Sequence, residues 1–188
     1  MQHISLRNSP QGYSSTLIAL HWLMLVLIVA VYACIELRTF FPRGSDPRET
    51  LKMWHFMLGL SVLFLASIRL VVRIMAGPAP DIVPPPNVWQ HRLAKTVHMF
   101  LYLFMLGMPI AGWVILSASG KPIPFFGLEL PPLTGENKDL STKVKEVHEL
   151  VGLAGYFLIG LHAAAALVHH YLFRDNTLKR MLKNGRRG

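Results

Sequence analysis

The sequence predicts an all-α protein, an integral membrane four-helix bundle in a single membrane domain over residues 1–188. Hydrophobic residues make up 52% of the 188 residues and charged residues only 15%, whereas a soluble domain has about 25% charged residues. The apolar residues also gather into four long segments, and about 20 apolar residues span a bilayer as a helix. A soluble four-helix bundle is the alternative, but its helices need a polar face that these segments lack.

The hydropathy along the chain sets the four predicted spans at about residues 16–38, 52–75, 93–117 and 146–173. The first span has no charged side chain between Ser9 and Ile35. It is longer than the apolar part of a cleaved signal peptide, so we expect it to remain as a helix. The second span is the weakest, because Lys52 and Arg69 must extend toward the headgroups. Pro109 predicts a kink in the third span.

The connections between the spans predict little secondary structure. Residues 77–88 are rich in proline and predict an extended cytoplasmic linker. Residues 117–141 predict a long outer loop rich in Pro and Gly, and residues 174–188 predict a basic cytoplasmic tail.

The Lys and Arg residues are divided unequally between the two sides. Eleven of the 19 lie on the side that holds both termini, together with two acidic residues. The other eight lie on the opposite side, together with eight acidic residues. The positive-inside rule therefore places both termini in the cytoplasm. A basic excess is one mark of nucleic-acid binders. Here, however, the whole net charge of +9 belongs to the predicted cytoplasmic side, where it meets anionic lipid headgroups. We expect membrane lipid as a partner and no nucleic acid.

Histidines at membrane depth indicate the chemistry, because ionisable residues there are costly and usually functional. His148 and His162 are fourteen residues apart on the fourth span. At about 100° per residue they lie within about 40° of one another around the helix, and about 21 Å apart along it. One histidine near each leaflet, on one stripe, is the geometry that holds two haems stacked across a bilayer.

Each haem needs a second axial ligand from another helix. His55 begins the second span on the outer side and matches His148, whereas His21 lies deep on the cytoplasmic half of the first span and matches His162. His98 on the third span competes with His21. It is only three residues from a charged side chain, which indicates a position nearer the headgroups and favours His21.

Glycines support this arrangement. Gly59 follows His55 by four residues and Gly152 follows His148 by four, so each leaves room for a porphyrin one turn deeper. A zinc or copper site would gather its ligands at one depth, with carboxylate or thiolate support. The uncharged cores of the spans have no acidic residue, and Cys34 is the single cysteine. Paired imidazoles leave iron no open position and favour outer-sphere electron transfer. We identify no catalytic acid, base or nucleophile.

With this histidine pattern the sequence resembles the bacterial cytochrome b561 family of four-helix di-haem cytochromes. That family has one histidine on helix 1, one on helix 2 and two on helix 4 spaced by fourteen. The stretches that carry the resemblance are residues 20–23, 36–43, 155–170 and 175–178. They are most similar to the family members that oxidise superoxide and reduce ubiquinone.

The resemblance implies two haem b cofactors in a multi-pass protein of the bacterial inner (plasma) membrane. His21 and His162 would be the iron ligands of the inner haem, and His55 and His148 those of the outer haem. It also implies an oxidoreductase that takes electrons from periplasmic superoxide and passes them to ubiquinone.

Cations near His55 suggest how an anionic donor is attracted. They lie in the connection before the second span and at its start: Arg38, Arg43, Arg48 and Lys52. Such a cluster raises the on-rate of a small anion in a salt-dependent way. The alternative is that these are flanking charges offset by neighbouring acidic residues.

His169 and His98 are candidates for the quinone site. His169 lies about 10.5 Å beyond His162 on nearly the same helix face, and His98 is not needed as a ligand in this scheme. Either could hydrogen-bond a quinone or supply a proton. The alternative for each is an interfacial histidine bonded to lipid or backbone.

Two other functions remain open. One is a non-catalytic cytochrome b subunit that relays electrons between a dehydrogenase partner and the quinone pool. The other is a haem-free transporter that uses histidines as proton relays.

Overall fold

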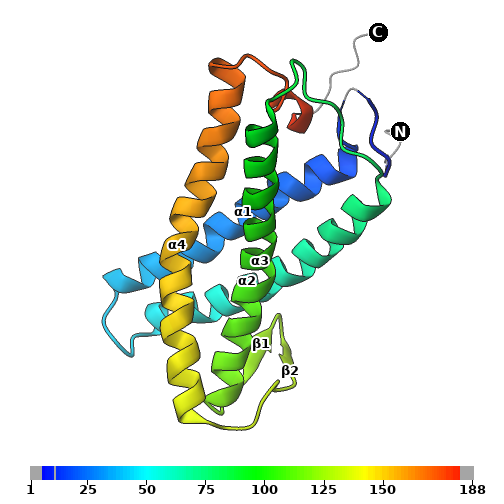
Figure 1. The fold of residues 1–188 in the computed structure, drawn as a ribbon. Helices are drawn as coiled ribbons and strands as arrows, with labels where there is room; N and C mark the ends of the chain where they lie inside the picture. The colour runs from blue at the N-terminus through cyan, green and yellow to red at the C-terminus, as the bar shows by residue number, and fades with distance from the viewer. Residues whose placement is uncertain (1–5, 11, 183–188) are drawn as a thin grey trace.

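Four long helices dominate the structure, a computed structural model that describes residues 6–10 and 12–182 (Figure 1). The helices are α1 (Ser15–Leu37), α2 (Asp46–Met75), α3 (Val88–Ala118) and α4 (Lys138–Tyr171), with short 3-10 helices at Arg38–Phe40 and Lys179–Met181. Each of the four is long and apolar enough to cross a membrane, as the hydropathy predicts. α3 continues through Pro109 without a break.

Helices that follow one another in the sequence pack side by side: α1 on α2, α2 on α3, and α3 on α4. The N-terminal segment, the linker after α2 and the C-terminal segment meet at one end. Asn8 N–H donates to the Ala76 carbonyl, and the Val83 N–H donates to the Asn176 side chain. The connections after α1 and α3 lie at the other end, where both contact α2. The chain segments therefore divide between two ends as the sequence predicts.

Capping residues explain why α3 and α4 begin before their predicted spans. α3 begins at Val88, five residues before the predicted position 93, behind a capping box formed by Asn87 and Gln90. α4 begins at Lys138, eight residues before the predicted position 146. The Asn137 side chain accepts a hydrogen bond from the Leu140 N–H at 3.0 Å, and Lys143 pairs with Asp139 one turn on. Caps and i,i+4 ion pairs stabilise polar helical turns, so this helix extends out of its apolar segment.

A small β-hairpin corrects the expectation of an entirely helical chain with an irregular outer loop. β1 (Ile123–Phe125) pairs antiparallel with β2 (Leu128–Leu130). The turn residues Phe126 and Gly127 both have positive φ, 47° and 83°, as the two-residue turns of hairpins require. Ile123 is buried with Leu60 of α2 and Leu116 of α3, so the hairpin covers the end of the bundle opposite the two termini.

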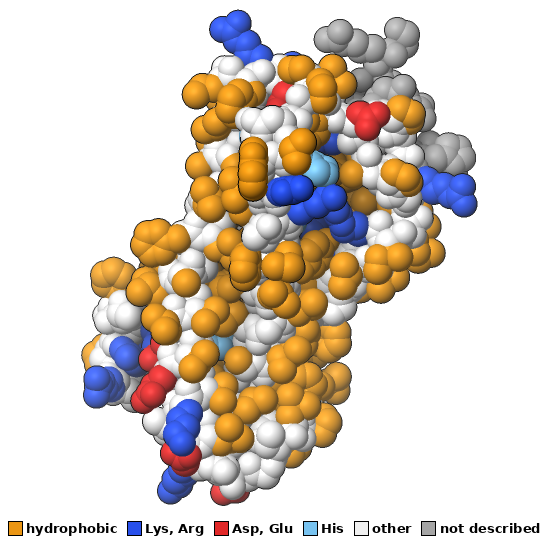
Figure 2. All heavy atoms as spheres, viewed as in Figure 1, with side chains coloured by type: hydrophobic (Ala, Val, Ile, Leu, Met, Phe, Trp, Pro, Cys, Tyr) orange, Lys and Arg blue, Asp and Glu red, His pale blue; other side chains and the backbone are white. Residues whose placement is uncertain are grey.

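The interior is narrow, and most large apolar side chains face outward. A small core between the helices contains Met24, Val62, Ala66 and Met105. Figure 2 shows hydrophobic side chains over most of the visible face, with acidic side chains only toward its two ends. An apolar surface of this extent indicates lipid contact.

Candidate functional site

Two histidines face each other at the outer end of the bundle. The imidazole of His55 on α2 lies 6.4 Å from that of His148 on α4, measured between ring centroids. His55 Nδ1 is 3.0 Å from the Val31 carbonyl oxygen, so Nδ1 carries the proton and donates it. That bond leaves the Nε2 lone pair free for a metal.

Three histidines meet at the other level. His21 on α1 lies 6.2 Å from His162 on α4, and His98 on α3 lies 5.3 Å from the same ring. The sequence places His98 nearer the headgroups, but the structure brings it against His162.

The centroid distances test whether an iron fits between each pair. A metal–imidazole bond is about 2.0–2.1 Å and the nitrogen lies about 1.1 Å from the ring centroid, so opposite ligands of one iron have centroids about 6.3 Å apart. The outer pair at 6.4 Å and the His21–His162 pair at 6.2 Å both match this value. The His98–His162 distance of 5.3 Å is too short. The spacing of each of the two pairs is compatible with one iron between the rings, and His21 matches that spacing better than His98.

Of the two glycines predicted to leave room beside the outer pair, Gly59 has open space and Gly152 has a neighbour at ordinary contact distance. A Cβ on Gly59 would have no other atom within 4 Å, and one on Gly152 would meet Met108 Cε at 3.6 Å. Larger side chains at these two positions would fill that space. The glycines thus suit a planar group held between His55 and His148.

Between the two levels the bundle is closely packed. Gly155 lies seven residues from both His148 and His162. A Cβ there would clash with the Tyr32 hydroxyl and lie 2.5 Å from the Phe104 ring. Tyr32 also donates a hydrogen bond to the Gly152 carbonyl at 2.7 Å. α1, α3 and α4 therefore pack closely at this point, and Tyr32 and Phe104 separate the two histidine levels.

The four predicted donor-attracting cations lie at the same end as His55, and three of them have structural partners. Arg38 Nε donates to the Ile35 carbonyl oxygen at 3.2 Å. Arg48 donates to the carbonyl oxygens of Arg38 and Phe41, at 3.0 and 2.8 Å. Lys52 forms an ion pair with Glu49 at 2.7 Å. Arg48 therefore holds the turn together.

Arg43 differs from Arg48 because its side chain is exposed on that turn. It is thus the better candidate for attracting an anion.

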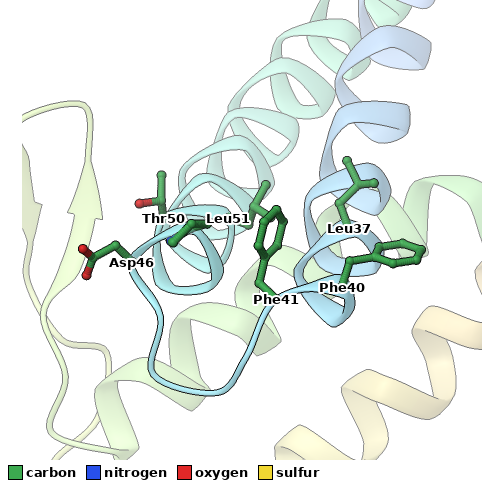
Figure 3. Close-up of a pocket in the computed structure, with 7 residues that line it drawn as sticks. Leu37, Phe40, Phe41, Asp46, Thr50 and Leu51 are labelled. Atoms are coloured by element: carbon green, nitrogen blue, oxygen red, sulfur yellow. The ribbon is translucent and has the colours of Figure 1, made fainter.

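A surface hollow of about 690 Å³ lies beside this turn but contains none of the four cations. Figure 3 shows Phe41 between Leu51 and Phe40, with the Asp46 carboxylate on the far side of Thr50. The lining is mainly apolar, so the hollow does not suit a small anion.

His169 has a fixed partner at the C-terminal end of α4. Its Nδ1 lies 2.5 Å from Oδ2 of Asp175, which is buried. Burial raises the pKa of Asp175, but hydrogen bonds from His169 and Thr177 outweigh it and hold the pKa below its usual value. His169 is therefore a bonded side chain whose Nδ1–H donates to this carboxylate.

The C-terminal segment that follows Asp175 is docked against α1 and the linker after α2. Trp22 donates to the Met181 carbonyl at 2.9 Å, and Arg180 donates to the Pro80 carbonyl. The remaining basic residues of the predicted tail, from 183 onward, lie outside the described residues.

Asp175→Asn should loosen this docked segment. A carboxylate with a lowered pKa stabilises the fold above its ordinary pKa of about 4 and loses that contribution as the pH falls through the lowered value. Hydrogen bonds to a charged group contribute about 1.5–3 kcal/mol. We expect faster tryptic cleavage near Lys179 at neutral pH, measured by mass spectrometry. Asp81→Asn, which changes an exposed carboxylate of the linker, should cleave as the wild type does; equal rates for both variants would contradict an anchoring role of Asp175.

Arg69 departs from its predicted position. It does not extend toward the headgroups: Nη1 lies 3.1 Å from the Tyr102 hydroxyl and Nη2 lies 3.4 Å from His21 Nδ1. The sequence contains a signal for this position. Arg69 follows His55 by fourteen residues, the interval that separates His148 from His162.

Four helices of membrane length, with histidines facing each other at two levels, define a multi-pass membrane protein of the cytochrome type. Residues 12–184 match the family model for prokaryotic cytochrome b561. The chain belongs to the prokaryotic cytochrome b561 family, and its function is membrane electron transfer with b-type haem.

Curated relatives match over nearly their whole length. "Probable superoxide oxidase CybB" of Yersinia pestis is 41% identical over 174 residues, 93% of this chain and 97% of that protein. "Cytochrome b561 homolog 1" of Escherichia coli (strain K12) is 39% identical over 170 residues, 90% of this chain and 96% of that protein. "Cytochrome b561 homolog 2" of the same organism is 26% identical over 180 residues, 95% of each chain.

Proposed function

We propose that residues 1–188 act as one membrane domain that oxidises superoxide and reduces ubiquinone. The observation that carries the proposal is the pair of facing-histidine sites at two levels, 6.4 and 6.2 Å across. Two haem b groups, when bound, would supply one-electron storage at each level. The relative with the printed name "Probable superoxide oxidase" supports superoxide as the donor.

The reaction balances with two electrons and two protons: two superoxide anions and one quinone give two dioxygen molecules and one quinol. His55 and His148 would hold the outer group from both faces, and His21 and His162 the inner one. With two histidines assigned to each group, the donor and the quinone would exchange electrons with it without binding the metal.

We place the His55 level on the periplasmic side of the bacterial inner membrane and both termini in the cytoplasm. Without Arg69, which lies at the level of the inner histidines, ten of the 19 Lys and Arg residues belong to the side of the termini and eight to the other side; cations are concentrated on cytoplasmic faces. The segments that carry them meet at one end of the bundle. Superoxide then meets the protein at the end where Arg43 is exposed.

The quinone requires protons on the cytoplasmic side. The His169–Asp175 pair lies two turns beyond His162 along α4 and is joined at 2.5 Å. His169 can deliver a proton to a quinone oxygen and recover one through Asp175. His98, which contacts the His162 ring at 5.3 Å, is the second candidate to face the quinone.

The test uses the purified chain in detergent. Superoxide generated enzymatically should produce the reduced haem absorbance, superoxide dismutase should abolish it, and a soluble ubiquinone analogue should reoxidise the haem. If superoxide fails and only a co-purifying dehydrogenase reduces the haem, the chain is a relay subunit and the proposal is wrong.

Arg43→Gln should lower the rate of this reduction about twofold at low ionic strength, because the nearby cation attracts the anionic donor. The difference should vanish at high salt, where exposed charges are screened. Lys138→Gln removes an exposed outer cation from the start of α4 and serves as the matched control. A salt-independent effect, or an equal effect of both variants, would contradict attraction at Arg43.

A further inference from the structure

Arg69 is a half-buried cation at the level of the inner histidines. It lies on α2 fourteen residues after His55, which places both on one side of the helix and about 21 Å apart. At the outer level α2 therefore contributes a histidine to the site, and at the inner level it contributes an arginine. Its guanidinium lies within hydrogen-bonding distance of His21.

No carboxylate neutralises this guanidinium among residues 6–10 and 12–182. None of the ion pairs found there includes Arg69. Its Nη1 donates to the Tyr102 hydroxyl, whose ring lies 5.8 Å from Cζ, and its Nε is buried without a partner. A charge in a membrane interior is costly unless an opposite charge or several hydrogen bonds compensate it. The site therefore lacks an anion.

The contact with His21 indicates when that anion is needed. An arginine can only donate hydrogen bonds, so His21 Nδ1 accepts from Nη2. Iron bound at Nε2 leaves the proton on Nδ1, and two donors then face each other. When the histidine holds a metal, Arg69 must therefore turn to another acceptor.

We infer that Arg69 binds a propionate carboxylate of the inner haem, with the Tyr102 hydroxyl beside it as a neutral donor. The inference rests on the proposed placement of that haem between His21 and His162. A haem brings two carboxylates with it, and a guanidinium binds a carboxylate through two parallel hydrogen bonds. The bound cation also favours the reduced form of the nearby iron, which draws electrons from the outer to the inner level.

Two variants test the inferred contact between Arg69 and a haem propionate. They are Arg69→Gln and Arg69→Lys, each purified with haem bound. We expect Arg69→Gln to keep two haems while the equilibrium constant for reducing one of them falls about tenfold, equivalent to about 59 mV for one electron. Arg69→Lys, which keeps the charge, should remain near the wild type. Redox titration of the visible spectrum gives both values.

A second measurement reports the carboxylate directly. With haem labelled with ¹³C at the propionate carboxyls, the infrared redox-difference band should shift in Arg69→Gln. If Arg69→Gln loses the inner haem, Arg69→Lys is measured instead. A lysine ammonium binds a carboxylate as a point charge and not through two parallel hydrogen bonds, so the propionate band should shift in that variant too.

Arg92→Gln is the control, since Arg92 lies over the exposed Trp89 ring at 5.4 Å near the start of α3. Unchanged bands and reduction constants in the Arg69 variants, or equal shifts in Arg92→Gln, would overturn the inference. A wild-type protein without two haems would instead refute the proposed function.

Discussion

His148→Ala is expected to yield a folded protein that holds one haem instead of two and no longer reduces quinone with superoxide. His148 supplies one of the two imidazoles of the outer pair, 6.4 Å from His55, and a single axial histidine leaves the iron weakly held and open. The inner pair is on another level of the bundle and should keep its haem. Haem per chain, from the pyridine haemochrome spectrum, should fall from two to one.

The remaining haem in that variant should be reduced by dithionite but not by superoxide, because the entry point is lost while the inner site survives. His91→Ala provides the control, since His91 is an exposed histidine in the first turns of α3. His91→Ala should keep both haems. Two haems in His148→Ala would refute the assignment of the outer ligands.

The four helices could be predicted because the membrane imposes one simple requirement, a long run of apolar residues. The true starts of α2, α3 and α4 could not, because they lie in polar turns outside the apolar segments. Side-chain caps stabilise the starts of α3 and α4, and the Glu49–Lys52 ion pair stabilises that of α2. Asp46 begins α2 six residues before the apolar segment, with Pro47 in its first turn. The hairpin was also beyond prediction, since its strands have three residues each and depend on packing of Ile123 against two helices.

The facing histidines could be anticipated because helical geometry alone relates positions fourteen residues apart. The position of His98 could not, since counting residues to the nearest charge gives a depth along one helix and ignores how helices cross. Arg69 shows the same difficulty. Hydropathy treats it as a residue that extends to the headgroups, whereas its contacts with Tyr102 and His21 direct it inward.

We expect Gly155→Ala, which adds one carbon atom, to be among the most destabilising substitutions of this size in the chain. The new Cβ would clash with the Tyr32 hydroxyl and lie 2.5 Å from Phe104, at the point where α1, α3 and α4 converge. Overpacking of this kind costs about 1–3 kcal/mol, and α4 carries the histidines of both levels. We therefore expect a lower midpoint of thermal unfolding in detergent, together with a reduced haem content.

Gly160→Ala is the matched control, because a Cβ there meets no atom within 4 Å and alanine favours helix by about 1 kcal/mol over glycine. Gly160→Ala should match or exceed the wild type in thermal stability and keep its haem. Adding Tyr32→Phe to Gly155→Ala removes the clashing hydroxyl and should recover part of the lost stability. If Gly155→Ala equals Gly160→Ala, the space between the two histidine levels is not closely packed. The separation of those levels would then need a cause other than Tyr32 and Phe104.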